Sequence, residues 1–265
     1  MTLPINEIVC GDNVSTMQTF PDDSIDLVVT SPPYDNLRTY GGHSWDFEGV
    51  AQQLWRVIKP GGVVVWVVAD ATIDGSETGT SFRQALRFME IGFRLHDTMI
   101  WEKYGIRFPE SNRCHPIFEF MFILSKGAPD TFREIADRRN ETAGCVAPST
   151  PEPNPDGSMR RPQRKVVTKQ FGGRVNIWKV REKEYGERSH PGAFPEALAR
   201  DHILSWSNEG DIVLDPFSGS GTTAKMARLM GRKFIGIEIN PEYCEIARKR
   251  LRQNVFEFSV DSAEE

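Results

Sequence analysis

The 265-residue chain is long enough for one large α/β domain or two small ones, and its 39% hydrophobic and 26% charged residues are typical of a soluble protein. The longest apolar run, VVVWVVA at 63–69, is far too short to cross a bilayer. The four cysteines form no CxxC pair, which favours reduced thiols in a cytoplasmic protein. The five histidines form no ligand-spaced cluster, so no metal site is expected. A net charge of −5 disfavours a nucleic-acid binder only if the charge is evenly spread.

Strands and helices alternate along the first half of the chain. Apolar, β-branched runs that end in small polar residues predict strands, and apolar residues spaced three and four apart predict helices. Phe82, Ala85, Leu86 and Met89 form such an apolar helix face. The predicted elements are strands at 7–12, 25–31 and 63–68, helices at 50–58 and 81–91, and a hairpin of 97–101 with 117–125 at the edge of the sheet.

The composition changes in the middle of the chain. Residues 147–165 contain five prolines and no apolar period, so a loop or a disordered excursion is expected there. Regular patterning resumes after Pro195 and predicts helices at 195–207, 222–231 and 241–253, strands at 211–216 and 233–239, and a frayed acidic tail at 255–265. Strands alternating with helices indicate an α/β fold with a doubly wound, mostly parallel sheet.

Positive charge is concentrated in one segment. Residues 159–188 contain ten basic and three acidic residues, which gives a local charge of +7 and leaves −12 for the rest of the chain. Such asymmetry is typical of a face that binds a polyanion, and a solvated, flexible basic loop is the alternative. The basic residues are Arg160, Arg161, Arg164, Lys165, Lys169, Arg174, Lys179, Arg181, Lys183 and Arg188.

A glycine-rich turn is the best-defined unit. A buried strand ends at Asp215, a loop with Gly219 and Gly221 turns into a helix, and a second strand ends at Glu238, 19 residues after Gly219. Glycines let a ligand approach a helix N-terminus, and an acid about 20 residues further on is placed to bind ribose hydroxyls. The loop lacks the Gly-Lys-Ser/Thr ending of a phosphate loop and a strict GxGxxG pattern. It would suit a nucleoside with a carboxylate but no phosphates, and a purely structural turn is the alternative.

Three motifs together resemble those of the DNA amino-methyltransferases, which transfer a methyl group from S-adenosylmethionine to an exocyclic base nitrogen. TSPPY at 30–34 resembles the catalytic motif of the family, DPFSGSGTT at 215–223 its cofactor motif, and SHPGAFPEAL at 189–198 the short motif that precedes the cofactor motif. The catalytic motif comes first, which is the permuted order of the beta group. The resemblance covers about 1–125 and 189–254.

The resemblance assigns the catalytic step to Ser31, Pro32, Pro33 and Tyr34. Ser31 and the Pro32 carbonyl would accept the amino hydrogens of the base and make its nitrogen more nucleophilic, because a proline presents its carbonyl on a rigid backbone. Tyr34 would stack on the flipped-out base. Within the family, a serine at the first position goes with cytosine N4 and an aspartate with adenine N6, so cytosine N4 is expected.

Further residues are assigned by the same resemblance, some with an alternative role. The alternative for Asp12 is a turn or helix cap in place of a cofactor contact, and that for His190 is a helix cap. Phe194 and Phe217 have the core as their alternative. The residues expected to bind the cofactor are Asp12, Thr30, His190, Phe194, Asp215, Pro216, Phe217, Gly219, Gly221, Thr222 and Glu238. Those expected to bind DNA are Arg38, Arg160, Arg161, Arg164 and Lys165.

The resemblance also implies a Rossmann-like class I methyltransferase fold, circularly permuted. Its expected parts are a catalytic half at 1–125, a target-recognition insertion at 126–188, a cofactor-binding half at 189–254 and the tail. Double-stranded DNA is the expected substrate, with a cognate restriction endonuclease as a functional partner and a homodimer as further expectations. The alternatives are the same reaction on adenine N6, a protein-glutamine methyltransferase and a non-catalytic DNA-binding protein.

Overall fold

The computed structural model describes residues 2–33, 45–105, 112–146, 154–159, 167–181 and 194–261, with the backbone alone from residue 254. The chain divides into two compact units, Met1–Arg133 with Asn176–Glu265, and Glu134–Val175. No helix in these described ranges is both long and apolar enough to cross a membrane.

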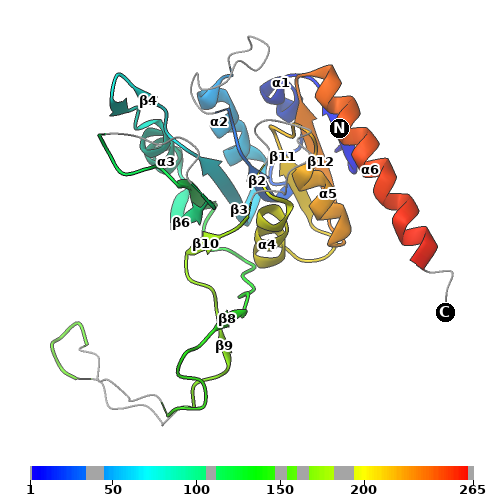
Figure 1. The fold of residues 1–265 in the computed structure, drawn as a ribbon. Helices are drawn as coiled ribbons and strands as arrows, with labels where there is room; N and C mark the ends of the chain where they lie inside the picture. Colours follow the sequence, from blue (N-terminus) through cyan, green and yellow to red (C-terminus); the bar gives the residue numbers. More distant parts are fainter. Residues whose placement is uncertain are drawn as a thin grey trace. The chain divides into compact units, whose positions relative to one another are not determined.

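The first unit is built on an eight-stranded sheet (Figure 1). In spatial order its strands are β1 (Glu7–Cys10), β12 (Lys233–Glu238), β11 (Ile212–Asp215), β2 (Ile25–Thr30), β3 (Ile58–Val68), β7 (Phe118–Ser125), β6 (Arg94–Glu102) and β10 (Ile177–Lys179). Strand β7 is antiparallel to β3 and β6, and the other neighbouring strands are parallel. The predicted doubly wound, mostly parallel sheet is confirmed.

Six helices flank this sheet within the part of the chain that the structure describes. They are α1 (Asn13–Gln18), α2 (Phe47–Val57), α3 (Thr80–Ile91), α4 (Glu196–Trp206), α5 (Thr222–Leu229) and α6 (Pro241–Asp261). Helix α2 packs between α1 and α3, and α5 packs between α4 and α6 (Figure 1). Two short strands, β4 (Thr72–Ile73) and β5 (Ser76–Glu77), form a separate exposed hairpin.

The central strands are apolar because helices cover both of their faces. All six residues of VVVWVV at 63–68 are at most 1% exposed, and Leu27, Val28 and Val29 of β2 are fully buried. Each such side chain contributes about 1.5–3 kcal/mol on burial, so these strands are a large source of hydrophobic stabilisation.

The helix predicted at 81–91 is present as α3, but most of the apolar residues that predicted it lie on its exposed face. Of the apolar residues whose spacing predicted the helix, Ala85 is buried, whereas Phe82, Leu86 and Met89 are 52%, 59% and 46% exposed. The buried face of α3 carries Gln84, whose Oε1 accepts a hydrogen bond of 2.9 Å from the indole Nε1 of the fully buried Trp66. A buried indole N–H needs an acceptor, and Gln84 supplies it beside the buried Ala85 and Phe88 of the same helix face.

The predicted hairpin is also present, since β6 and β7 pair with Met99 opposite Met121. It does not form the edge of the sheet, however, because β10 adds outside β6 with Trp178 opposite Trp101. Residues 177–179 therefore belong to the sheet of the first unit rather than to an insertion.

The second compact unit is accordingly narrower than the insertion expected at 126–188. Its strands β8 (Arg138–Arg139) and β9 (Phe171–Gly172) are antiparallel, and Val146 bridges to Val167. An ion pair of 2.5 Å joins Arg174 to Asp137. At the other end of the chain, α6 continues to Asp261, so a helix occupies much of the segment expected as a frayed tail.

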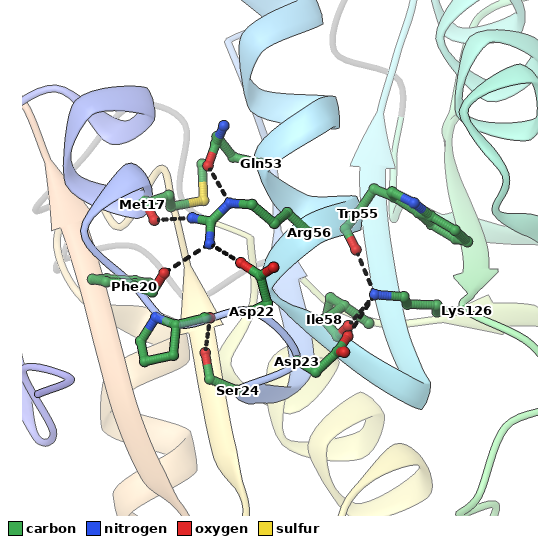
Figure 2. A network of polar contacts seen from close by, with 11 residues as sticks. Met17, Phe20, Asp22, Asp23, Ser24, Gln53, Trp55, Arg56, Ile58 and Lys126 are labelled. Atoms are coloured by element: carbon green, nitrogen blue, oxygen red, sulfur yellow. Dashed lines mark hydrogen bonds and ion pairs between the residues drawn. The ribbon is translucent and has the colours of Figure 1, made fainter. Parts of the chain in front are cut away.

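Two cationic side chains, Arg56 of α2 and Lys126 after β7, donate to carbonyls near two helix ends at the amino-terminal edge of the central strands (Figure 2). The guanidinium of Arg56 donates to the carbonyl oxygens of Met17 at 2.6 Å and Phe20 at 2.7 Å, just where α1 ends. The Nζ of Lys126 donates to the carbonyl of Trp55 at 2.9 Å, near the end of α2. Cations that donate to the last carbonyls of a helix stabilise that helix, so we interpret these contacts as stabilising the fold.

Candidate cofactor and catalytic site

The carboxyl ends of β1, β12, β11, β2 and β3 lie at the opposite edge, because these five strands run in parallel. Strands β11 and β2 are neighbours, yet the chain leads from β2 to β3 on one side and from β11 to β12 on the other. In open α/β sheets, ligands bind outside the strand ends at such a switch point. The structure thus brings the two motifs at Thr30 and Asp215 together there.

A buried hydrogen bond joins the two motifs directly. Oγ1 of Thr30 donates to Oδ1 of Asp215 at 2.7 Å, and the backbone N–H of Phe217 donates to the same oxygen at 3.1 Å. Burial raises the pKa of Asp215 to about 6, although these hydrogen bonds act in the opposite direction. Thr30 and Asp215 were both expected to contact the cofactor. Their hydrogen bond holds the end of β2 against the end of β11.

The glycine loop after β11 adopts backbone conformations that favour glycine. Gly219 and Gly221 have φ angles of +50° and +80°, and Gly221 immediately precedes α5. A Cβ on Gly221 would lie 2.9 Å from the Cβ of Ala247 in α6. Within the described residues, the buried hydroxyl of Ser218 has no hydrogen-bond partner. The loop is therefore tightly packed against α6 and carries little side chain of its own.

Glu238 holds this loop from the end of the next strand. Its Oε2 accepts from the backbone N–H of Gly219 at 2.8 Å, and its Oε1 accepts from the N–H of Asn240 at 2.8 Å. A carboxylate offers about four acceptor sites, so Glu238 keeps capacity for further donors such as hydroxyl groups. Its expected contact with a ribose stays a prediction.

Aromatic rings back the loop. The half-buried ring of Phe217 lies edge-on to Trp45, with centroids 5.0 Å apart, and 6.3 Å from Trp66. Phe194 is buried at the start of α4. Both phenylalanines are therefore at least partly buried, which agrees with the core position given as their alternative role. A contact of either with a cofactor stays a prediction. Trp45 was given no role of its own in the sequence analysis, where it lies only a few residues before the helix predicted at 50–58.

An ionic network was also missed. The guanidinium of Arg250 donates to the Ser220 carbonyl at 3.0 Å and to Oγ1 of Thr222 at 3.2 Å, and it pairs with Glu196. Nζ of Lys225 pairs with the same carboxylate at 3.1 Å. The network joins the starts of α4 and α5 to α6 around the glycine loop. In sequence, each of these charges looks like part of an ordinary solvated helix face.

Asp12 acts as a helix cap, which was its alternative role. The side chain of Asp12 is exposed and its Oδ1 accepts from the backbone N–H of Ser15 at 2.8 Å, at the start of α1. The neighbouring Asn13 donates through Nδ2 to the Pro216 carbonyl at 3.2 Å, so this turn contacts the cofactor motif. A contact between Asp12 and a cofactor stays a prediction.

The catalytic motif begins directly after β2. Pro32 is buried, and Ser31 and Pro33 are half-buried. The remaining expected site residues lie outside the described residues; they are Tyr34, Arg38, Arg160, Arg161, Arg164, Lys165 and His190.

Comparison with known proteins places the sequence among DNA methyltransferases. A family model described as DNA methylase, for N6 and N4 methyltransferases, matches residues 25–249. The orphan methyltransferase M.BamHII of Bacillus amyloliquefaciens is 56% identical over 241 residues, which span 88% of this chain and 91% of the relative.

Solved structures agree with the fold. The Thermus thermophilus protein TTHA0409, in complex with S-adenosyl-L-methionine, is 26% identical with a TM-score of 0.63, over 94% of this chain and 95% of that chain. The cytosine-N4-specific PvuII DNA methyltransferase is 20% identical with a TM-score of 0.65, over 92% and 87% of the two chains. This second likeness shows the fold alone, which is that of the class I methyltransferases.

Proposed function

Because the chain belongs to the DNA methylase family of N6 and N4 amino-methyltransferases, which use S-adenosylmethionine, we propose that it methylates the N4 amino group of cytosine in double-stranded DNA. The observation that carries the choice of base is the serine at position 31, the first residue of SPPY, at the switch point of the sheet. The family membership disfavours a protein-glutamine substrate and a non-catalytic role. Adenine N6 is the second candidate, because both bases present an amino group that needs the same acceptors.

The residues at the switch point fit S-adenosylmethionine. Gly219 and Gly221 present backbone without a side chain, and Glu238 has acceptor capacity left for ribose hydroxyls. Neither feature calls for a phosphate group. We assign the ribose to Glu238 and an apolar wall to Phe217, which the rings of Trp45 and Trp66 support from behind. When bound, S-adenosylmethionine supplies an electrophilic methyl group.

The chain's own residues prepare the base. The hydroxyl or carbonyl of Ser31 and the carbonyl of Pro32 accept the two amino hydrogens, which draws the nitrogen lone pair out of conjugation with the ring. The buried hydrogen bond between Thr30 and Asp215 fixes the strand end from which these acceptors project. Such fixed placement is the main catalytic contribution expected for a direct displacement. Tyr34 supplies the stacking that the flipped base loses, about 1–3 kcal/mol.

Nucleoside mass spectrometry tests the proposal. The protein is incubated with S-adenosylmethionine and unmethylated, mixed-sequence double-stranded DNA, and the digested DNA is analysed. We expect N4-methylcytosine from the wild type, a large loss with Tyr34→Ala, and recovery with Tyr34→Phe, which keeps the ring. N6-methyladenine from the wild type would overturn the interpretation of Ser31.

A second variant examines the first motif position alone. Ser31→Asp is assayed on both bases, with S-adenosylmethionine affinity measured in parallel as the control for an intact cofactor site. We expect cytosine methylation to fall while the affinity stays unchanged.

The remaining expectations keep the status of predictions. These are target recognition by residues 126–188, a homodimer, a cognate restriction endonuclease as functional partner, and a cytoplasmic location.

A further inference from the structure

A cluster of cations on one aromatic ring lies at the same edge of the sheet as the catalytic motif. Nζ of Lys179 lies 5.0 Å from the ring centroid of Tyr104, and Cζ of Arg181 lies 4.9 Å from it. The Tyr104 side chain is 44% exposed, and Lys179 and Arg181 are exposed as well. The face of an aromatic ring attracts cations, so this arrangement keeps two positive charges close together.

The backbone that carries the two cations is fixed. Strand β10 pairs in register with β6, with Lys179 opposite Glu102. The indole Nε1 of the buried Trp101 then donates to the Val180 carbonyl at 3.1 Å, between the two cationic residues. The backbone of Lys179 is thus held in the sheet, and that of Arg181 follows two residues after the end of β10.

The cluster carries a surplus positive charge. Lys179 pairs with Glu102, whose hydrogen bond raises the pKa of Lys179, so the charges of these two residues offset each other. Arg181 has no carboxylate partner among the described residues, and it lies over the Tyr104 ring instead. A guanidinium held in place by a ring suits an external phosphate, which it can bind through two parallel hydrogen bonds.

The strand order gives an approximate distance between the cluster and Ser31. Strands β2, β3, β7, β6 and β10 are successive neighbours, and β6 and β10 end at the edge where β2 ends. Four spacings of about 4.8 Å place Lys179 and Arg181 ~19 Å from Ser31 along this edge. At about 3.4 Å per nucleotide of one DNA strand, that span corresponds to roughly five or six nucleotides.

We propose that Tyr104, Lys179 and Arg181 form a phosphate-binding site for the DNA backbone, about five or six nucleotides from the methylated base. The site lies in the first compact unit, outside residues 134–175, and would add affinity without reading sequence. The inference rests on the proposed function only for its substrate, double-stranded DNA.

Salt dependence of DNA binding tests the site. Full-length protein with S-adenosylhomocysteine is titrated into a fluorescent 30-base-pair duplex of mixed sequence between 50 and 200 mM NaCl. Losing one phosphate contact lowers the slope of log K against log salt by about 0.9. We therefore expect the advantage of the wild type over Arg181→Gln to shrink by about 3.5-fold across that range, and Tyr104→Ala to act in the same direction.

A matched variant separates a local contact from net charge. Lys233→Gln removes one exposed positive charge at the start of β12, on the opposite edge of the sheet, and should leave the slope unchanged. Equal slopes for the wild type and Arg181→Gln, with equal unfolding temperatures, would refute the site. The site would also be refuted if Arg181→Gln changed the affinity for polyglutamate and left the affinity for DNA unchanged. If DNA treated with the wild-type protein carried no N4-methylcytosine, the proposed base would be refuted instead. The comparison of the slopes would still be valid.

Discussion

Replacing Asp215 by Asn should change how the stability of the protein depends on pH. Burial raises the pKa of Asp215 from an ordinary value of 3.8 to about 6. Between these two values the folded protein holds a proton that the unfolded chain has released. The free energy of unfolding of the wild type therefore falls as the pH rises from about 4 to about 6, and it is constant above that range as far as this group is concerned.

The size of the effect follows from the two pKa values. Their difference corresponds to about 3 kcal/mol, of which about 2 kcal/mol falls between pH 4.5 and 7. Asparagine has the same shape and keeps an acceptor oxygen for the hydroxyl of Thr30 and the N–H of Phe217. It has no proton to lose, so Asp215→Asn should lack this component.

Urea unfolding of both proteins at a series of pH values, without cofactor, measures the difference. All other titrating groups are shared and cancel between the two proteins. We expect Asp215→Asn to gain about 2 kcal/mol relative to the wild type from pH 4.5 to pH 7. Parallel curves over this range would show that the carboxyl of Asp215 ionises normally in the folded protein and would refute the reasoning.

Three further predictions concern the helix ends and the glycine loop. Arg56→Ala should lower the free energy of unfolding by about 1–3 kcal/mol in urea, because carbonyls at the end of α1 lose their donor; an unchanged midpoint would contradict this. Gly221→Ala should cost about 1–3 kcal/mol and weaken S-adenosylmethionine binding by calorimetry, and adding Ala247→Gly should restore part of the loss by relieving the contact but not the positive φ. Glu196→Gln should weaken S-adenosylmethionine binding about fivefold by freeing Arg250, and an equal affinity would assign the network to stability alone.

The parts of the fold that the sequence predicted are those in which local pattern and burial agree. The strands of the central sheet are runs of β-branched residues buried on both faces, so their pattern and their environment give the same answer. The helix α3 was also expected, but its spacing pattern did not show which residues it buries. Gln84 is buried there and accepts a hydrogen bond from Trp66, a partner that no local pattern of the helix reveals.

The site was predictable to the extent that it is written in contiguous motifs. The glycine loop and the serine–proline turn are such motifs, and they are found at neighbouring strand ends. Residues that act from distant elements were not predictable, because Trp45 touches Phe217 across 172 positions of the chain and Arg250 reaches Ser220 from another helix. An aromatic residue before a helix and a charged residue on a helix face are both common, and only the fold shows the partners of Trp45 and Arg250.

The order of the strands has a consequence for the synthesis of the protein. The first strand, β1, has β12 as its neighbour in the sheet, and β2, which leads into SPPY, lies between β3 and β11. During translation, one backbone edge of β2 therefore stays unpaired until 186 further residues have been made, as shown by the pairing of Leu27 with Val213. Such long-range pairing slows folding and exposes strand edges to aggregation. The two ends of the polypeptide thus depend on each other, and methylation competence can appear only after translation has passed the glycine loop.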